Sequence, residues 1–340
     1  MTGAPGAPGR RVAVTAAFTD AALDRLRSEV PGVRTAPELF GEQRWVADHA
    51  GSGRVPDGLA ELVGDAEVAF GIPADSAEGL RALAGCPSLR WVQATAAGAA
   101  GTVREAGDLG NLVVTTGAGV HGQGLAEFAL AGVLHHTRGV PRLLADSAAR
   151  TWPSRRPHRE LTDLRALVLG LGAVGTRTAR LLAACGVQVT GVRHDLSKPT
   201  PAGVDAVHPP DQVARLATRA DLLVITLPGG PATDGLVDAE VLAALPDGAV
   251  VVNVGRGTVL DTGALLAGLD AGHLAGAALD VTDPEPIPED SPLWDRADVL
   301  LSPHTAALSA HEDDRLVSVF LAQLGRYRRG EQLEHVVDLG

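Results

Sequence analysis

The chain has 340 residues, of which 45% are hydrophobic, and this length and composition allow two buried cores. Acidic residues outnumber basic ones by 41 to 29, which gives a formal charge of −12 and a sequence pI near 5.3. A chain with this balance has no broad basic field for a phosphate backbone, so we expect no nucleic-acid partner.

The basic residues include a single lysine, Lys198, and the other 28 are arginine. Lys198 lies in the Pro-rich segment SKPTP, a poor place to desolvate an amine for Schiff-base or general-base chemistry. The two cysteines, Cys86 and Cys185, form neither a disulfide framework nor a zinc pattern, so we expect no metal and a reduced, cytoplasmic setting. We interpret Cys185 as a small core residue of a helix.

The N-terminal segment MTGAPGAPGRR is rich in Gly and Pro and lacks the apolar core of a signal peptide. No apolar run later in the sequence is long enough to span a membrane. We therefore expect a frayed tail and no membrane association.

The first half of the chain alternates short apolar runs with helical patterns. A helix is expected over residues 19–30 with Thr19 as its N-cap. The apolar runs that end in small or turn residues cover residues 11–18, 66–73, 89–98 and 111–119. Strands that alternate with helices predict a parallel, doubly wound sheet.

A second series of six strand candidates begins near residue 164. They are RALVLGLGAVG (165–175), VQVTGVRH (187–194), ADLLVITLP (220–228), AVVVNVGRG (249–257), LAGAALDV (274–281) and DVLLSPH (298–304). Six strands separated by helical segments match a full dinucleotide-binding (Rossmann) sheet. This predicts an α/β protein with two doubly wound parallel sheets.

A long helical stretch over residues 121–151, interrupted at Gly139–Pro141, links the two series. A last helical stretch, residues 308–330, has no strand series of its own and is assigned back to the first domain. We therefore expect one domain inserted in the other. Residues 118–305 form the dinucleotide-binding domain, and residues 1–117 with 306–340 form the substrate-binding domain.

Three glycines, Gly170, Gly172 and Gly175, have the spacing G-x-G-x-x-G between a strand and an apolar-periodic helix. The first makes the turn, the second lets the backbone approach a pyrophosphate, and the third lets the helix pack on the strand. This context makes an otherwise weak motif a strong indication of a dinucleotide site.

The residue that reads the ribose is expected about twenty positions after this motif. Arg193 stands there, where an NAD-preferring protein usually has an acid, and an arginine can neutralise a 2′-phosphate. We therefore favour NADP(H) over NAD(H). Asp195 leaves NAD(H) open, because it could reach a 2′-hydroxyl if the strand ends later.

Polar residues follow three candidate central strands of the second series. Arg256 follows one, Asp280 and then Glu285 follow the next, and His304 follows the last. Because carboxyl ends of parallel strands meet at one edge of a sheet, these four groups are expected to converge near a nicotinamide.

Long blocks of the sequence now resemble the D-isomer-specific 2-hydroxyacid dehydrogenase family, which includes phosphoglycerate dehydrogenase and the glyoxylate and hydroxypyruvate reductases. They are GLGAVG, LPDGAVVVNVGRGTVLDTGALLAGL, GAALDVTDPEPIPEDSPLW and LLSPHTA, within a resemblance that covers roughly residues 60–335. The resemblance implies a flavodoxin-like substrate domain, a Rossmann cofactor domain and a homodimer formed through the cofactor domain.

By this resemblance Arg256, Glu285 and His304 stand at the catalytic triplet, and Asp280 contacts the nicotinamide carboxamide. The chemistry agrees, since reduction of a 2-oxo acid needs a hydride at C2, a proton at the carbonyl oxygen and a cation for the carboxylate. His304 is the expected proton donor, Glu285 would favour its imidazolium form, and Arg256 would bind the substrate.

The resemblance also places a substrate-carboxylate loop at Ala97 and Gly98. The sequence departs from the family pattern at Ala100 in this loop, and at Thr226 in the separate segment TLPGGPATDGLV. The remaining cofactor contacts that the resemblance implies fall on Ala173, Val174, Leu227, Pro228, Thr233 and Val254. His121, His135 and His136 lie on the linking helix and are interpreted as packing or interface residues.

The sequence therefore predicts an NAD(P)H-dependent enzyme that reduces a small 2-oxo acid to a D-2-hydroxy acid. The alternative is a catalytically silent, dinucleotide-sensing binding module of the same fold, similar to corepressors that resemble these dehydrogenases.

Overall fold

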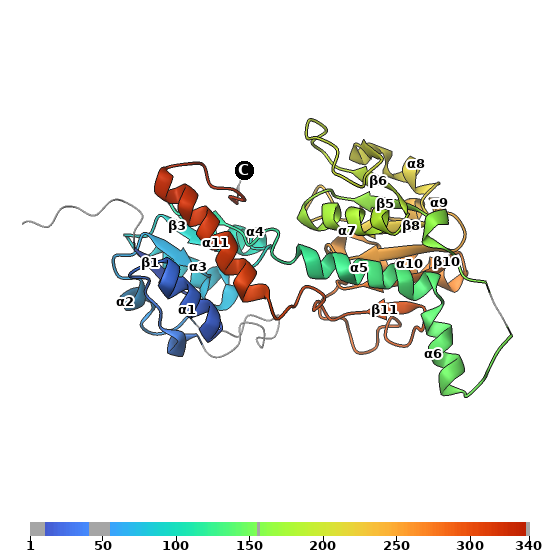
Figure 1. The fold of residues 1–340 in the computed structure, drawn as a ribbon, viewed down its shortest axis with the longest axis horizontal. Helices are drawn as coiled ribbons and strands as arrows, with labels where there is room; N and C mark the ends of the chain where they lie inside the picture. The colour runs from blue at the N-terminus through green and yellow to red at the C-terminus, as the bar shows by residue number, and fades with distance from the viewer. Residues whose placement is uncertain (1–10, 41–54, 155–156, 338–340) are drawn as a thin grey trace, which may run out of the picture. The chain divides into compact units, whose positions relative to one another are not determined.

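The computed structural model describes residues 11–40, 55–154 and 157–337, so the N-terminal tail expected from the sequence lies outside the described residues. The chain divides into two compact units, one formed by Met1–Val120 with Ser309–Gly340 and the other by His121–Leu308. Each unit is built around its own parallel sheet with helices packed beside it (Figure 1). The predicted α/β class is confirmed.

The first unit has a four-stranded parallel sheet in the order β1-β2-β3-β4. Its strands are β1 (Val12–Val14), β2 (Val68–Phe70), β3 (Trp91–Gln93) and β4 (Val113–Thr115). An isolated parallel bridge from Ala13 to Arg34 extends the sheet beyond β1. Counted along the chain, the segment at Arg34 is the second strand, so the spatial order 2-1-3-4-5 is flavodoxin-like.

The described part of this unit contains five α-helices. They are α1 (Asp20–Glu29), α2 (Leu59–Val63), α3 (Ala77–Ala84), α4 (Ala100–Ala106) and α11 (Glu312–Arg329). Thr19 occupies the N-cap position of α1, as expected, although its side chain makes no capping hydrogen bond among the described residues. The Thr19 N–H instead donates to the carboxylate of Asp313, 2.7 Å away, at the start of α11.

Helix α11 packs against the first sheet although it follows the whole second unit in the chain. The ring of Phe320 stacks on that of Phe70, with centroids 4.3 Å apart, and also on Trp91. All three side chains are fully buried in one hydrophobic cluster. Burial of these large aromatic groups attaches the C-terminal helix to the N-terminal sheet.

The second unit has a seven-stranded parallel sheet in the order β11-β10-β9-β8-β5-β6-β7. Its strands are β5 (Arg165–Leu169), β6 (Gln188–Val192), β7 (Ala206–His208), β8 (Leu222–Ile225), β9 (Ala249–Asn253), β10 (Leu274–Leu279) and β11 (Val299–Leu301). This is the Rossmann order with an added seventh strand. The expectation of six strands was wrong because β7 is a three-residue edge strand, only partly buried, with no apolar run to mark it.

The helices of this unit are α5 (Gly122–Thr137), α6 (Val140–Ala148), α7 (Ala173–Ala184), α8 (Val213–Ala217), α9 (Ala239–Ala244) and α10 (Thr262–Asp270). Gly139, at a φ of 64°, separates α5 from α6 as the sequence suggested. Cys185 caps the C-terminus of α7 and is exposed, so its interpretation as a core residue was wrong. No helix in the described ranges combines the length and apolar character needed to cross a membrane.

Candidate active site

The carboxyl ends of the central strands lie in register across the second sheet. Leu279, the last residue of β10, pairs with Asn253 at the end of β9 and with Leu301 at the end of β11. Asn253 also pairs with Ile225, the last residue of β8. The segments that follow these strands therefore leave the sheet side by side, and they carry the predicted triplet.

The glycine turn between β5 and α7 has three different local constraints. Gly170 adopts a φ of 95°, which disfavours any side chain. A Cβ on Gly175 would lie 1.8 Å from the carbonyl oxygen of Gly170, whereas a Cβ on Gly172 would meet nothing within 4 Å. Helix α7 thus begins at an open backbone turn, and no side chain caps its N-terminus. Such a helix N-terminus favours a phosphate group.

Thr226, where this chain departs from the family pattern, directly follows β8 and holds the glycine turn in place. Its hydroxyl donates to the carbonyl oxygens of Leu169, at 3.0 Å, and Gly170, at 2.8 Å. The other predicted cofactor contacts lie in the same unit, at the start of α7 (Ala173 and Val174), in the loop after β8 (Leu227, Pro228 and Thr233) and after β9 (Val254). Thr233 closes the β8 loop by donating to the carbonyl oxygen of Pro228 at 2.5 Å.

Arg193 directly follows β6, at the edge of the candidate dinucleotide site. Its Nη2 donates to the carbonyl oxygens of Lys198 and, at 3.2 Å, Pro199, while its buried Nε has no acceptor among the described residues. Asp195 is engaged in its own turn, where hydrogen bonds from the Ser197 hydroxyl and backbone N–H lower its pKa. The loop after β6 therefore carries two cations, Arg193 and Lys198, and one carboxylate that is engaged in its own turn.

Asp280 follows β10 and is 1% exposed. Its Oδ1 accepts hydrogen bonds from the Ser302 hydroxyl, at 2.7 Å, and from the backbone N–H of Ala306, at 2.9 Å. Its Oδ2 is buried and receives no hydrogen bond from the described residues. A buried carboxylate oxygen without a donor is costly, so this atom fits an N–H donor supplied by a ligand.

His304 and Glu285 come together although 19 residues separate them in sequence. The Nδ1 atom of His304 and the Oε1 atom of Glu285 form a close hydrogen-bonded contact, and the two side chains are 33% and 27% exposed. This contact engages Nδ1, one of the two ring nitrogens. The backbone of His304 has a φ of 56°, which is uncommon outside glycine, and its N–H donates to the Asp280 carbonyl oxygen at 2.9 Å.

Arg256 leaves β9 through a loop that Asn253 organises. The fully buried Asn253 side chain accepts from the Gly255 N–H and donates to the Arg256 carbonyl oxygen, both at 3.0 Å. A Cβ on Gly257 would lie 1.9 Å from the carbonyl oxygen of Thr282, so the loops after β9 and β10 are in contact. Arg256 and the segment that carries Glu285 are therefore neighbours at the sheet edge.

The predicted substrate loop lies in the first unit, between β3 and α4. Ala97 and Gly98 are both exposed there.

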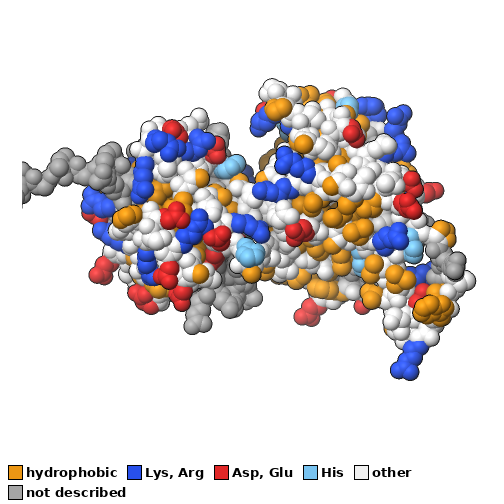
Figure 2. Space-filling model, in the orientation of Figure 1, with side chains coloured by type: hydrophobic (Ala, Val, Ile, Leu, Met, Phe, Trp, Pro, Cys, Tyr) orange, Lys and Arg blue, Asp and Glu red, His pale blue; other side chains and the backbone are white. Residues whose placement is uncertain are grey.

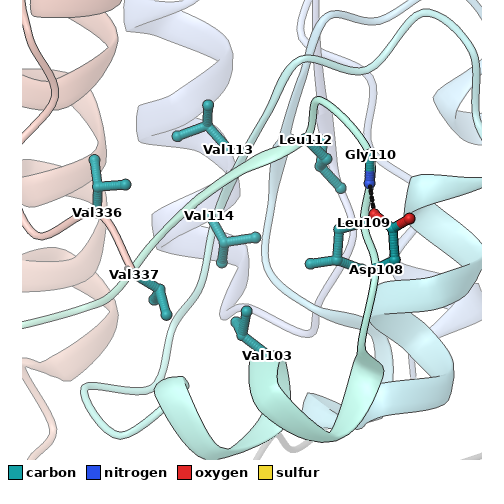
Figure 3. A pocket seen from close by; sticks show the side chains of 9 residues that line it. All are labelled: Val103, Asp108, Leu109, Gly110, Leu112, Val113, Val114, Val336 and Val337. Atoms are coloured by element: carbon teal, nitrogen blue, oxygen red, sulfur yellow. Dashed lines mark hydrogen bonds between the residues drawn. The ribbon is translucent and has the colours of Figure 1, made fainter. Parts of the chain in front are cut away.

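A cavity of about 230 Å³ lies elsewhere in this unit, and Figure 3 shows mainly aliphatic side chains around it. Its lining consists of Val103, Asp108, Leu109, Gly110, Leu112, Val113, Val114, Val336 and Val337, none of which is a predicted site residue. The Asp108 carboxylate accepts the N–H of Gly110, so the cavity offers little chemistry.

The residues of the second unit fit a nicotinamide dinucleotide on two structural grounds. The open start of α7 would receive the pyrophosphate, and the unpartnered Oδ2 of Asp280 would receive an amide N–H. When bound, the cofactor supplies or accepts a hydride.

Ser302 and Asn253 were not predicted from the sequence. Each is a polar residue at the end of an apolar strand, and this pattern could have indicated them.

The comparisons with known proteins agree with this geometry. Residues 130–306, more than half of the chain, match the family model for the NAD binding domain of D-isomer specific 2-hydroxyacid dehydrogenases. The chain is 34% identical over 218 residues to a D-3-phosphoglycerate dehydrogenase from Mycobacterium bovis, a match that covers 63% of this chain and 40% of that protein.

Two solved structures match nearly the whole chain. One is a D-isomer specific 2-hydroxyacid dehydrogenase from Xanthobacter autotrophicus in complex with NADPH and MES, with 30% identity, a TM-score of 0.77, and coverage of 96% of this chain and 98% of that one. The other is an NADPH-dependent glyoxylate/hydroxypyruvate reductase from Sinorhizobium meliloti in complex with NADP and sulfate, with 27% identity, a TM-score of 0.75, and coverage of 96% and 98%. The chain belongs to the D-isomer specific 2-hydroxyacid dehydrogenase family.

Proposed function

We propose that this protein reduces a small 2-oxo acid to the D-2-hydroxy acid, with the hydride from NADP(H) or NAD(H) and the proton from His304. The observation that carries this proposal is the contact between His304 Nδ1 and the Glu285 carboxylate at the carboxyl edge of the second sheet. A carboxylate there orients the ring. Two electrons and one proton reach C2 as hydride, and the carbonyl oxygen takes the second proton from Nε2.

Arg256 is the proposed partner of the substrate carboxylate. Its planar, permanently charged guanidinium matches a carboxylate in geometry and charge. The Asn253 side chain holds the Arg256 loop by hydrogen bonds to the backbone of Gly255 and Arg256. Ala97 and Gly98, in the loop between β3 and α4, are proposed to bind substrate through their backbone N–H groups. Glyoxylate, hydroxypyruvate and similar small oxo acids are the proposed substrate class.

We propose NADP(H) as the preferred cofactor. The support is the cation Arg193 directly after β6, together with the engagement of Asp195 in its own turn. A cation at this position favours a 2′-phosphate, and an engaged carboxylate is less able to bind a ribose 2′-hydroxyl. The two solved structures described above are complexes with NADPH and with NADP, respectively.

The decisive experiment mixes the pure protein with NADPH or NADH and a panel of 2-oxo acids and follows the absorbance of the reduced cofactor. Turnover of at least one small oxo acid is expected, and chiral chromatography of the product should give the D isomer. Tight cofactor binding without turnover of any oxo acid would refute the proposed enzyme activity and favour the dinucleotide-sensing module.

We further propose that the protein is a cytoplasmic homodimer formed through the second unit. Helix α6 contributes no buried residue, and its Leu143 and Leu144 are 53% and 62% exposed. Leu134 on α5 and Trp152 after α6 are also exposed, and Figure 2 shows hydrophobic side chains gathered over the region of α5. An exposed apolar surface of this kind is typical of an interface. The free cysteines agree with a reducing compartment.

A further inference from the structure

Asp280 accepts hydrogen bonds from three residues of the loop that carries His304, namely Ser302, His304 and Ala306. Its Oδ1 accepts from the Ser302 hydroxyl and the Ala306 N–H, and its backbone carbonyl oxygen accepts from the His304 N–H. These contacts lie on both sides of His304, whose left-handed backbone needs such support. Asp280 thus joins the end of β10 to this loop, through its carboxylate at Ser302 and Ala306 and through its backbone carbonyl oxygen at His304.

The two oxygens of the Asp280 carboxylate have different surroundings. Oδ1 has two donors within 2.9 Å, whereas Oδ2 has none in the described part of the chain. Because the side chain is 1% exposed, water cannot readily satisfy Oδ2. Among the described residues, Ser302 donates the only side-chain hydrogen bond to Oδ1, so its hydroxyl fixes which oxygen is presented to a ligand.

We infer that Ser302 is a positioning residue that turns Asp280 Oδ2 toward the carboxamide N–H of the nicotinamide and, through Asp280, keeps His304 in place. This inference rests on the proposed function and on the fit described above, in which Asp280 Oδ2 would receive an amide N–H of the cofactor. Thr305 supports Ser302 from the side, since the two hydroxyl oxygens are 3.3 Å apart. Ser302 itself touches neither substrate nor reacting atoms in this scheme.

The test compares two cofactors by isothermal titration calorimetry. One is the oxidised cofactor that the wild-type protein binds more tightly, and the other is its 3-acetylpyridine analogue, whose methyl ketone has no N–H to donate. Wild-type protein is expected to prefer the natural cofactor by about tenfold, the value of a hydrogen bond to a charged group. Ser302→Ala should lose most of this preference, because natural-cofactor binding weakens while analogue binding barely changes.

Ser302→Thr, which keeps the hydroxyl, should restore the preference, and Ser88→Ala, which removes a serine hydroxyl bonded to the Gly64 carbonyl oxygen in the other unit, should leave it unchanged. If Ser302→Ala folds poorly, Ser302→Cys retains the volume with a weaker donor and is read by the same comparison.

Equal weakening of both cofactors in Ser302→Ala would mean that Ser302 has only a structural role, and unchanged binding of both would equally overturn the inference. A wild-type protein that does not discriminate between the cofactors would refute the contact from Asp280 to the carboxamide, and the inference with it. A different result would contradict the proposed function alone. In that case the cofactor preference and its dependence on Ser302 are observed, but no 2-oxo acid is reduced.

Discussion

The imidazole of His304 and the carboxylate of Glu285 meet through Nδ1 and Oε1 at the carboxyl edge of the second sheet. The two residues come from segments that follow neighbouring strands, β11 and β10, which pair in parallel. The contact at Nδ1 orients the ring, and the proposed proton transfer assigns the other nitrogen, Nε2, to the substrate.

His304→Gln is expected to lower kcat for oxo-acid reduction by about 100-fold to 10,000-fold, because glutamine cannot supply the proton. Cofactor affinity should change little, which calorimetry can check. Glu285→Gln keeps a hydrogen-bonding partner but removes the charge, so a smaller loss of about tenfold is expected. Most activity retained in His304→Gln would show that another group is the acid.

Gly172 and Gly175 should respond differently to alanine. A Cβ at Gly175 would lie 1.8 Å from a backbone oxygen, so Gly175→Ala should destabilise the protein by about 1–3 kcal/mol and lower Tm. Gly172→Ala meets no atom within 4 Å and should leave Tm unchanged, yet weaken cofactor binding about tenfold by filling the space of the pyrophosphate. Thermal unfolding and calorimetry measure the two effects, and equal Tm losses would contradict this separation.

Arg193→Asp should move cofactor preference from NADPH toward NADH. The change removes a cation and adds an anion, so the Kd of NADPH should rise at least about tenfold while that of NADH stays level or falls. Arg215→Ala, on α8 of the same unit, removes an arginine without this effect and serves as the control. An unchanged ratio of the two dissociation constants would show that Arg193 does not read the 2′ position.

The apolar surface of α6 should govern the oligomeric state. The wild-type protein is expected to have a solution mass near twice 34.8 kDa, and Leu143→Asp combined with Leu144→Asp should give the monomer, because charges oppose burial of that surface. Leu196→Asp, at a residue 50% exposed in the same unit, is the matched control. Light scattering after gel filtration measures all three, and a dimeric double variant would place the interface elsewhere.

His136 should make the stability of the second unit depend on pH. Burial lowers the pKa of His136, whose Nε2 donates to the Ala277 carbonyl oxygen 2.9 Å away. As the pH falls below about 6.5, the unfolded chain binds a proton that the folded ring resists, so stability decreases. His136→Gln keeps an N–H donor without titrating, and its urea midpoint should fall less between pH 7.5 and pH 5.5. Parallel decreases in the two proteins would assign the pH dependence to other groups.

Local patterns were sufficient to predict most of the strands and the glycine turn. The runs before Gly170 and Arg256 are apolar because strands buried on both faces must be, and their lengths exclude helices. The edge strand Ala206–His208 was not predicted because a partly buried strand needs no apolar run. The hydrogen bond from the Thr19 N–H to Asp313 could not be predicted from local patterns, since the two residues are almost 300 positions apart.

The sequence by itself determined the family, the fold class and the residue types available for the chemistry, since motif spacing and apolar periodicity are local properties of the chain. Only the tertiary structure decided that Glu285 contacts Nδ1 of His304, and that Ser302, His304 and Ala306 all bind Asp280. These contacts depend on the register of β9, β10 and β11, and register is set by packing across the whole sheet.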